Sequence, residues 1–129
     1  MTEPESPRVL LAEDDRFLRK AAETTLRRNG FTVLLASDGD EALRMARDQM
    51  PSIILLDMFM PKMQGMDVLR ALKEKPETAA IPVIIMSNAG ESGVRRQAVE
   101  AGAFGYFTKA SLSLEDLVNS VRLALNPPR

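Results

Sequence analysis

Short apolar runs recur along the chain at intervals that leave room for one helix between each pair. Each run is four to six residues long, and most are rich in β-branched residues, which predicts strands at residues 8–12, 31–36, 53–56, 82–86 and 105–108. Runs without polar alternation are typical of strands that are buried on both faces. The pattern therefore predicts a sheet that is covered by helices on both sides.

The segments between the strands have apolar residues at helical spacing. They predict helices at about 15–28, 38–49, 66–73, 91–101 and 113–125. Asp15, Asp38 and Ser113 stand where side chains accept hydrogen bonds from the first turn of a helix. The apolar face of the first helix is expected to comprise Phe17, Leu18, Ala21, Ala22, Thr25 and Leu26. Residues 73–80 are predicted to be a polar connection, and the sparse apolar stripe of 91–101 predicts a lightly packed, mobile helix.

Alternation of five strands with five helices is typical of an α/β fold with a parallel sheet. Right-handed crossovers then place helices on both faces. Such folds bind ligands in a crevice outside the carboxyl ends of the strands.

Polar residues follow the predicted strands at that same edge. Glu13 and Asp14 follow the first strand, Asp57 the third, Ser87 the fourth and Lys109 the fifth. Because the carboxyl ends of parallel strands meet at one edge of the sheet, we expect these five side chains to face a common crevice.

Converging carboxylates either share a proton or hold a hard cation. The chain contains no histidine and no cysteine, so Mg²⁺, bound by oxygen atoms, is the expected cofactor. Lys109 would add a positive charge and Ser87 a hydroxyl donor, a combination suited to phosphoryl transfer. Asp57 could then act as a nucleophile and form an aspartyl phosphate.

Composition narrows the class of protein further. A length of 129 residues suits one domain, predicted at 8–125, with a flexible leader at 1–7 and a tail or truncated linker at 126–129. A net charge of −1 favours neither nucleic acid nor an anionic membrane. No apolar run is long enough to span a bilayer, and no secretory signal is present, so a cytoplasmic location without membrane insertion is expected.

Four motifs together resemble one known family. They are Ala-Glu-Asp-Asp at 12–15, the run at 55–65, Ile-Ile-Met-Ser-Asn-Ala at 84–89 and Gly-Ala-Phe-Gly-Tyr-Phe-Thr-Lys at 102–109. Their order and spacing are similar to those of the receiver domains of two-component response regulators over residues 8–125. The resemblance implies a doubly wound, flavodoxin-like (βα)5 fold with strand order 2-1-3-4-5.

The resemblance also implies a role for each matching residue. Asp57 would be the phosphoacceptor, and Mg²⁺ would be bound by Asp14, Asp57 and the backbone carbonyl of Phe59, with Glu13 acting through water. Ser87 and Lys109 would contact the phosphoryl group, and Tyr106 would be the switch aromatic. Such a domain is a phosphoacceptor switch with slow self-catalysed phosphorylation and dephosphorylation, and is not classed as an enzyme.

The partners follow from the same resemblance. The phosphoryl donor would be a phosphohistidine on a sensor histidine kinase or a phosphotransfer protein. The output surface would comprise residues 91–101, 105–108 and 113–125, and would bind an output partner that the sequence does not identify. We expect a monomer or a weak phosphorylation-dependent dimer, and no direct nucleic acid binding by this domain.

The sequence departs from the family pattern at two positions. Ala110 follows Lys109 where the family usually has a proline in cis. Because a cis bond before a non-proline residue costs about 2.5–4 kcal/mol, this bond is predicted to be trans. Phe59 is bulky beside the acceptor, where it can hinder an attacking water.

Two other functions are compatible with parts of this pattern. A pseudo-receiver would bind partners without being phosphorylated, although the complete set of strand-end residues argues against it. A Mg²⁺-dependent phosphohydrolase of the haloacid dehalogenase type would need a second Asp two residues after Asp57, where this chain has Phe59.

Overall fold

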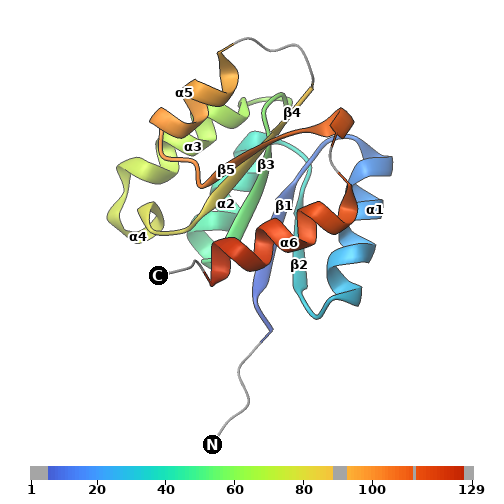
Figure 1. Cartoon of the computed structure of the whole chain (residues 1–129). Coiled ribbons are helices and arrows are strands. Elements are labelled where there is room, and N and C mark those ends of the chain that lie inside the picture. The colour runs from blue at the N-terminus through green and yellow to red at the C-terminus, as the bar shows by residue number, and fades with distance from the viewer. Residues whose placement is uncertain (1–5, 89–92, 112, 127–129) are drawn as a thin grey trace, which may run out of the picture.

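A computed structural model describes residues 6–88, 93–111 and 113–126 of the chain. The strands are β1 (Arg8–Ala12), β2 (Thr32–Ala36), β3 (Ile53–Asp57), β4 (Val83–Ser87) and β5 (Gly105–Thr108). They form one parallel sheet in the order β2-β1-β3-β4-β5 (Figure 1). This arrangement confirms the predicted doubly wound fold and its strand order.

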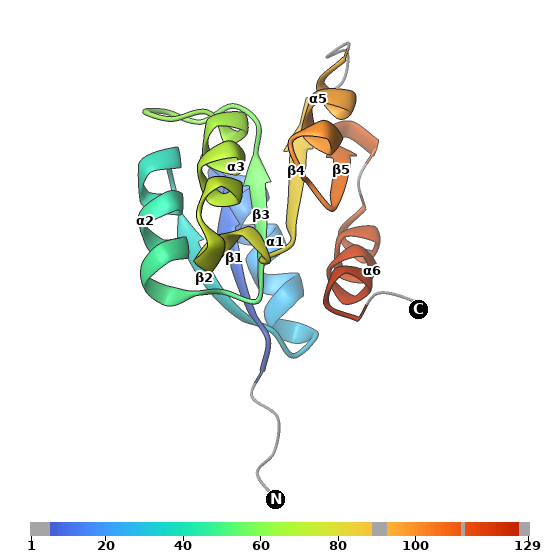
Figure 2. The same cartoon turned by 90° about the vertical axis from the view of Figure 1, so that its left-hand side faces the viewer.

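Helices cover both faces of the sheet. They are α1 (Arg16–Arg28), α2 (Gly39–Gln49), α3 (Gly65–Glu74), α4 (Pro76–Ala79), α5 (Val94–Glu100) and α6 (Leu114–Leu125), with a 3₁₀ turn at Lys109–Ser111. Residues of α1 and α6 form one hydrophobic cluster with the sheet, and residues of α2, α3 and α5 form the other. Figure 2 shows α2 and α3 on the opposite side of the sheet from α6.

Three of the predicted helix starts agree with the structure because local hydrogen bonds define them. Asp15, Asp38 and Ser113 each accept a hydrogen bond from a backbone amide in the first turn of the following helix. The Glu41 carboxylate accepts a hydrogen bond from the Ser37 amide at 3.2 Å, one residue before the cap.

The predicted polar connection at 73–80 was wrong, because the structure has the one-turn helix α4 there. Pro76 occupies its first position, where a missing amide proton costs nothing. Thr78 is buried and its hydroxyl donates to the Leu72 carbonyl oxygen at 2.7 Å. A single turn is too short to produce an apolar period, so hydrophobic spacing could not reveal it.

The predicted apolar face of α1 was only partly right. Ala22 and Leu26 are buried, whereas Phe17 is 90% exposed and Ala21 is also exposed. Phe17 and Ala21 lie at one margin of the stripe, because residues four apart share a line along the helix. The helix is rotated so that this margin faces solvent.

The ends of the chain and one helix start lie partly outside the described residues. These are most of the predicted leader (1–5), most of the tail (127–129) and the start of the fourth predicted helix (91–92), whose described part is α5. In the described part of that helix only Ala98 is fully buried, which agrees with light packing. None of the helices described is both long enough and apolar enough to cross a membrane.

Candidate functional site

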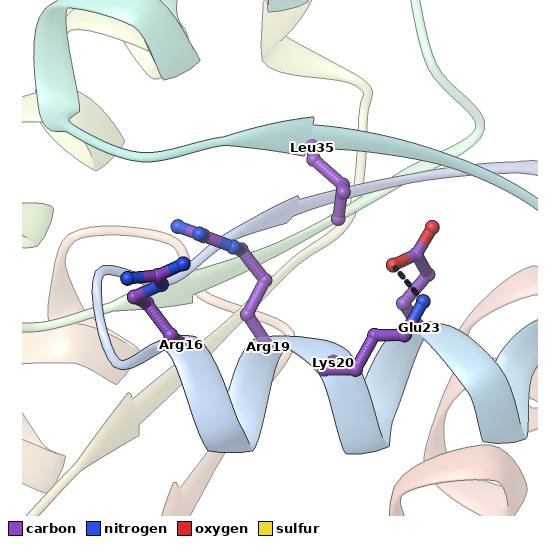
Figure 3. A pocket seen from close by; sticks show the side chains of 5 residues that line it. All are labelled: Arg16, Arg19, Lys20, Glu23 and Leu35. Atoms are coloured by element: carbon purple, nitrogen blue, oxygen red, sulfur yellow. Dashed lines mark ion pairs between the residues drawn. The ribbon is translucent and has the colours of Figure 1, made fainter.

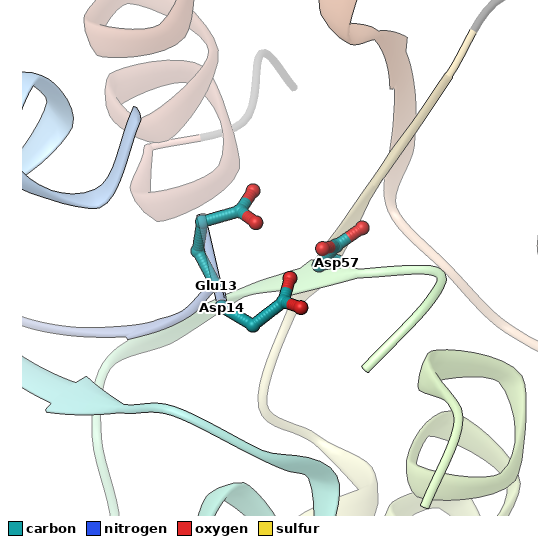
Figure 4. Close-up of side chains that lie close together, drawn as sticks. All are labelled: Glu13, Asp14 and Asp57. Atoms are coloured by element: carbon teal, nitrogen blue, oxygen red, sulfur yellow. The ribbon is translucent and has the colours of Figure 1, made fainter. Parts of the chain in front are cut away.

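The acidic side chains of two strand ends meet at the carboxyl edge of the sheet. Glu13 and Asp14 lie in the turn after β1, and Asp57 is the last residue of β3. Figure 4 shows their carboxylates directed toward a shared space. One carboxylate oxygen from each of the three lies within 4.8 Å of the others, a spacing that could hold a metal ion. The structure thus brings together the three acids that the sequence predicted.

The Lys109 ammonium lies between two of these acids. Its Nζ atom is 2.8 Å from Glu13 Oε1 and 3.0 Å from Asp57 Oδ2. Glu13 is completely buried and Asp57 is 3% exposed. Burial of a carboxylate is costly without a partner of opposite charge, and the Lys109 ammonium offsets part of that cost.

Backbone amides orient the same carboxylates. The Asp15 amide donates to Glu13 Oε2 at 3.0 Å, and the Phe59 amide donates to Asp57 Oδ1 at 3.3 Å. Asp14 is exposed and lies on the solvent side of the cluster. The site therefore has a buried, oriented inner pair and one acid that is accessible from solvent.

The environment shifts the pKa values of the inner groups. Burial and, after it, the neighbouring Glu13 carboxylate raise the pKa of Asp57 to about 7, and the Lys109 ammonium offsets only part of this rise. Burial acts to lower the pKa of Lys109, but its contacts with Glu13 and Asp57 outweigh burial and raise that pKa. In the absence of a bound metal ion, Asp57 therefore retains a proton up to near-neutral pH.

This shift predicts the pH dependence of stability in the metal-free protein. The Asp57 pKa rises from 3.8 in the unfolded chain to about 7 in the folded one, so between these values the folded state binds more protons. The stabilisation due to protonated Asp57 is complete below pH 3.8 and is lost as the pH rises through about 7. Asparagine does not ionise, so Asp57→Asn should not lose stability over this pH range. Above neutral pH the metal-free variant should be more stable than the wild type by ~1–3 kcal/mol.

Urea unfolding of the wild type and of Asp57→Asn across this pH range, in the presence of a chelator, measures the difference. Asp48→Asn, a substitution of an exposed acid on α2, serves as the control and should follow the wild-type curve. Parallel curves for the wild type and Asp57→Asn would contradict the assigned pKa shift.

Ser87 and Tyr106 lie on the neighbouring strands. Asp57 is in register with Met86, so Ser87 is one residue beyond it along β4. The Ser87 side chain is fully buried, and its hydroxyl donates to the Asn88 carbonyl oxygen at 3.3 Å. Tyr106 is half-buried on β5, with the Arg95 guanidinium 5.7 Å from the centre of its ring.

The loop after β5 forms without a cis bond. No cis peptide occurs among the described residues, so the Lys109–Ala110 bond is trans, as predicted. Lys109 opens the short 3₁₀ turn and still reaches Glu13 and Asp57. The position of Lys109 in the site is thus compatible with Ala110 at the next position.

Pockets formed by the described residues also lie outside the acidic cluster, and two of them bear on the function. One, of about 300 Å³, lies between α1 and β2 and is lined mainly by cationic side chains (Figure 3): Arg16, Arg19 and Lys20, with Glu23 and Leu35. The other, of about 280 Å³, is lined by residues of β5, α5 and α6, including Arg95, Tyr106 and Leu123. The second cavity lies on the surface that the sequence predicted to bind the output partner.

One contact at the site was not predicted from the sequence. Arg19 Nη1 donates to the backbone carbonyl oxygen of Glu13 at 3.0 Å and fixes the turn that presents the acids. An arginine on an amphipathic helix is ordinarily a solvated residue, and nothing in the spacing of Arg19 distinguishes it from Arg16 or Lys20.

Comparison with known proteins gives matches over almost the whole chain. The family model "Response regulator receiver domain" matches residues 9–122. The response regulator MprA of Mycobacterium ulcerans is 34% identical over 120 residues, which cover 93% of this chain and 50% of that protein. The chain spans about half the length of several of the curated relatives that it matches.

Solved structures of the same type share the fold. The Francisella response regulator 1452 receiver domain has a TM-score of 0.85 and 28% identity, covering 93% of this chain and 97% of that one. A putative response regulator from Chloroflexus aurantiacus has a TM-score of 0.87 and 26% identity, covering 93% of this chain and 98% of that one.

Proposed function

This chain belongs to the family of response regulator receiver domains, and on that premise we propose that it accepts a phosphoryl group on Asp57 in a Mg²⁺-dependent reaction. The observation that supports this best is the position of Lys109 Nζ, 3.0 Å from Asp57 Oδ2 and 2.8 Å from Glu13 Oε1. One ammonium in contact with a cluster of three acids leaves excess negative charge for a metal ion, and the ammonium can also contact a phosphoryl oxygen.

The residues present fit Mg²⁺. Glu13, Asp14 and Asp57 offer only oxygen ligands, which hard cations prefer. Asp14, Asp57 and the Phe59 carbonyl would hold the ion directly, and Glu13 would hold it through water. When bound, the ion would neutralise charge on the phosphoryl oxygens and keep Asp57 ionised at neutral pH.

The transfer uses Asp57 as the nucleophile. A carboxylate oxygen of Asp57 attacks phosphorus, the bond from phosphorus to the imidazole nitrogen of the donor breaks, and the imidazole leaves with that electron pair. Lys109 and the Ser87 hydroxyl stabilise the phosphoryl oxygens. A water molecule later attacks phosphorus, and the carboxylate and inorganic phosphate are released. Slow turnover of this kind makes the domain a switch rather than an enzyme.

The new charge would change the surface that includes Tyr106. The phosphoryl group adds about −1.5 to −2 charge at Asp57. The Ser87 hydroxyl, which donates to the Asn88 carbonyl oxygen in this structure, would turn to the phosphoryl group. Tyr106 would then move inward, away from Arg95, and change the surface of α5, β5 and α6 that the 280 Å³ cavity marks.

The partners are part of this proposal. The donor would be a histidine kinase or a phosphotransfer protein, and the output partner would bind the surface of α5, β5 and α6. The chain alone would be a monomer or a weak dimer in the phosphorylated state.

Thermal unfolding of the wild type tests this function. Mg²⁺ at about 100 times its Kd should stabilise the protein by ~2.7 kcal/mol, and beryllofluoride should stabilise it further only when Mg²⁺ is present. A chelator should reverse both effects. A wild type that responds to neither ligand would favour a pseudo-receiver, and steady turnover of phosphate esters would favour the phosphohydrolase.

A further inference from the structure

The loop between β3 and α3 is held at its base and on its inner side. We call residues 58–64 the acceptor loop, because they follow Asp57 directly. The Gly65 amide donates to the Met58 carbonyl oxygen at 2.9 Å and closes the loop. Met58 and Met60 are buried in the core, whereas Phe59 is 42% exposed. The core thus fixes the inner side of the loop but leaves its outer side to other contacts.

The outer side of the acceptor loop contacts the first residues of α2. The Gly39 amide donates to the Pro61 carbonyl oxygen at 3.3 Å. A Cβ atom on Gly39 would lie 1.9 Å from the Met63 carbonyl oxygen and 2.6 Å from its carbonyl carbon. Lys62 Nζ lies 3.6 Å from Asp38 Oδ2. The absence of a side chain at Gly39 therefore makes a notch into which the loop backbone fits.

The contacted part of the loop is strained. Lys62 has a φ of 70°, which is unusual for a residue with a side chain. The Met63 amide donates to the Pro61 carbonyl oxygen at 2.8 Å, which makes a tight three-residue turn around Lys62. Such conformations persist only where the surroundings hold them. The Gly39 notch, the Gly39–Pro61 hydrogen bond and the Asp38–Lys62 ion pair contact this part of the loop.

The position of this loop matters to the site through Phe59. The Phe59 amide donates to Asp57 Oδ1 at 3.3 Å, so the loop backbone orients the carboxylate. We propose that the notch at Gly39, assisted by the Asp38–Lys62 ion pair, positions the acceptor loop so that Asp57 and the Phe59 carbonyl bind the cation together. Gly39 and Asp38 are then positioning residues for Asp57, an inference that rests on the proposed function.

Gly39→Ala tests the notch. The new Cβ meets backbone rather than a flexible side chain, so the acceptor loop must move. We expect the Kd for Mg²⁺, measured by calorimetry, to rise about tenfold or more, as for other residues that orient metal ligands. In the metal-free protein, NMR signals of the amides at 57–65 should shift.

Gly30→Ala is the matched control. Gly30 lies after α1 with a φ of 92°, and a Cβ atom there would have no neighbour within 4 Å, so its substitution costs stability without touching the acceptor loop. Its Kd for Mg²⁺ should stay within about twofold of the wild-type value.

Asp38→Asn tests the ion pair in a protein that should fold. The asparagine oxygen can still accept the capping hydrogen bond from the Glu41 amide, which Asp38 accepts at 2.8 Å. We expect a rise of about two- to threefold in the Kd for Mg²⁺ at low salt, and a smaller rise at high salt. Asp40→Asn removes an exposed acid from the same turn of α2 and should have less effect.

The outcomes separate this inference from the function on which it rests. A wild type that does not bind Mg²⁺ contradicts the proposed function. A wild type that binds Mg²⁺, with an unchanged Kd in Gly39→Ala, contradicts the positioning role alone. If Gly39→Ala does not fold, equal Kd values for Asp38→Asn and Asp40→Asn contradict it instead.

Discussion

Asp57→Asn should abolish phosphoryl uptake. The amide that replaces the carboxylate is a poor nucleophile and carries no charge for the cation, so phosphorylation by a small acyl phosphate should fall below about 1% of the wild-type rate. The mass of the intact protein measures incorporation of the phosphoryl group. Beryllofluoride binding, followed by fluorine NMR, should be lost in the same variant.

The substitution is nearly isosteric, so loss of the fold would not explain the result. In the metal-free protein above neutral pH, Asp57→Asn should be more stable than the wild type, because the wild-type carboxylate is ionised there in a buried site. Asp48→Asn should be phosphorylated at the wild-type rate. Uptake by Asp57→Asn at that rate would exclude Asp57 as the acceptor.

Lys109→Gln should cause the second largest loss. The ammonium contacts both buried carboxylates, and in the proposed reaction it also stabilises the phosphoryl oxygens as charge develops. Removal of one such charge-stabilising donor typically costs about 10²-fold in rate, which we expect for phosphorylation by a small acyl phosphate at saturating Mg²⁺.

The same substitution has a second consequence that a purely structural role would not produce. Without Lys109, the Glu13 and Asp57 carboxylates face each other without compensation, so the pKa of Asp57 should rise further. The pH at which half of the Lys109→Gln protein binds Mg²⁺ should therefore be higher than the corresponding pH for the wild type. Lys75→Gln, on an exposed residue, should change neither the rate nor this pH. Wild-type rates in Lys109→Gln would contradict the role of Lys109.

The strands and the three capped helix starts were predictable because local rules define them. An unbroken apolar run such as 53–56 is typical of a strand that is covered on both faces. The structure agrees, because β3 is buried throughout. Asp15 and Asp38 cap their helices through hydrogen bonds within three residues. The rotation of α1 was not predictable, because the whole stripe has helical spacing, and only packing against the sheet decided that Phe17 faces solvent.

Two glycines show the same difference between what sequence patterns predict and what only packing decides. In the sequence, Gly39 and Gly65 are ordinary markers of a helix start or a turn. In the structure, a Cβ on Gly39 would meet the Met63 carbonyl oxygen, and one on Gly65 would lie 2.3 Å from the Asp57 carbonyl oxygen. These close approaches join segments distant in sequence or depend on the path of the acceptor loop, so spacing alone could not reveal them.

The sequence by itself determined which residues reach the carboxyl edge of the sheet. Each strand is an apolar run followed by polar residues, and because the strands are parallel, these polar residues all lie at the same edge. It also determined the absence of histidine and cysteine, and hence the preference for oxygen ligands. Only the tertiary structure decided that Lys109 lies between Glu13 and Asp57, that Asp14 stays exposed, and that α2 holds the acceptor loop. Those outcomes depend on how the strands twist and the helices pack, and such contacts join residues up to 96 positions apart.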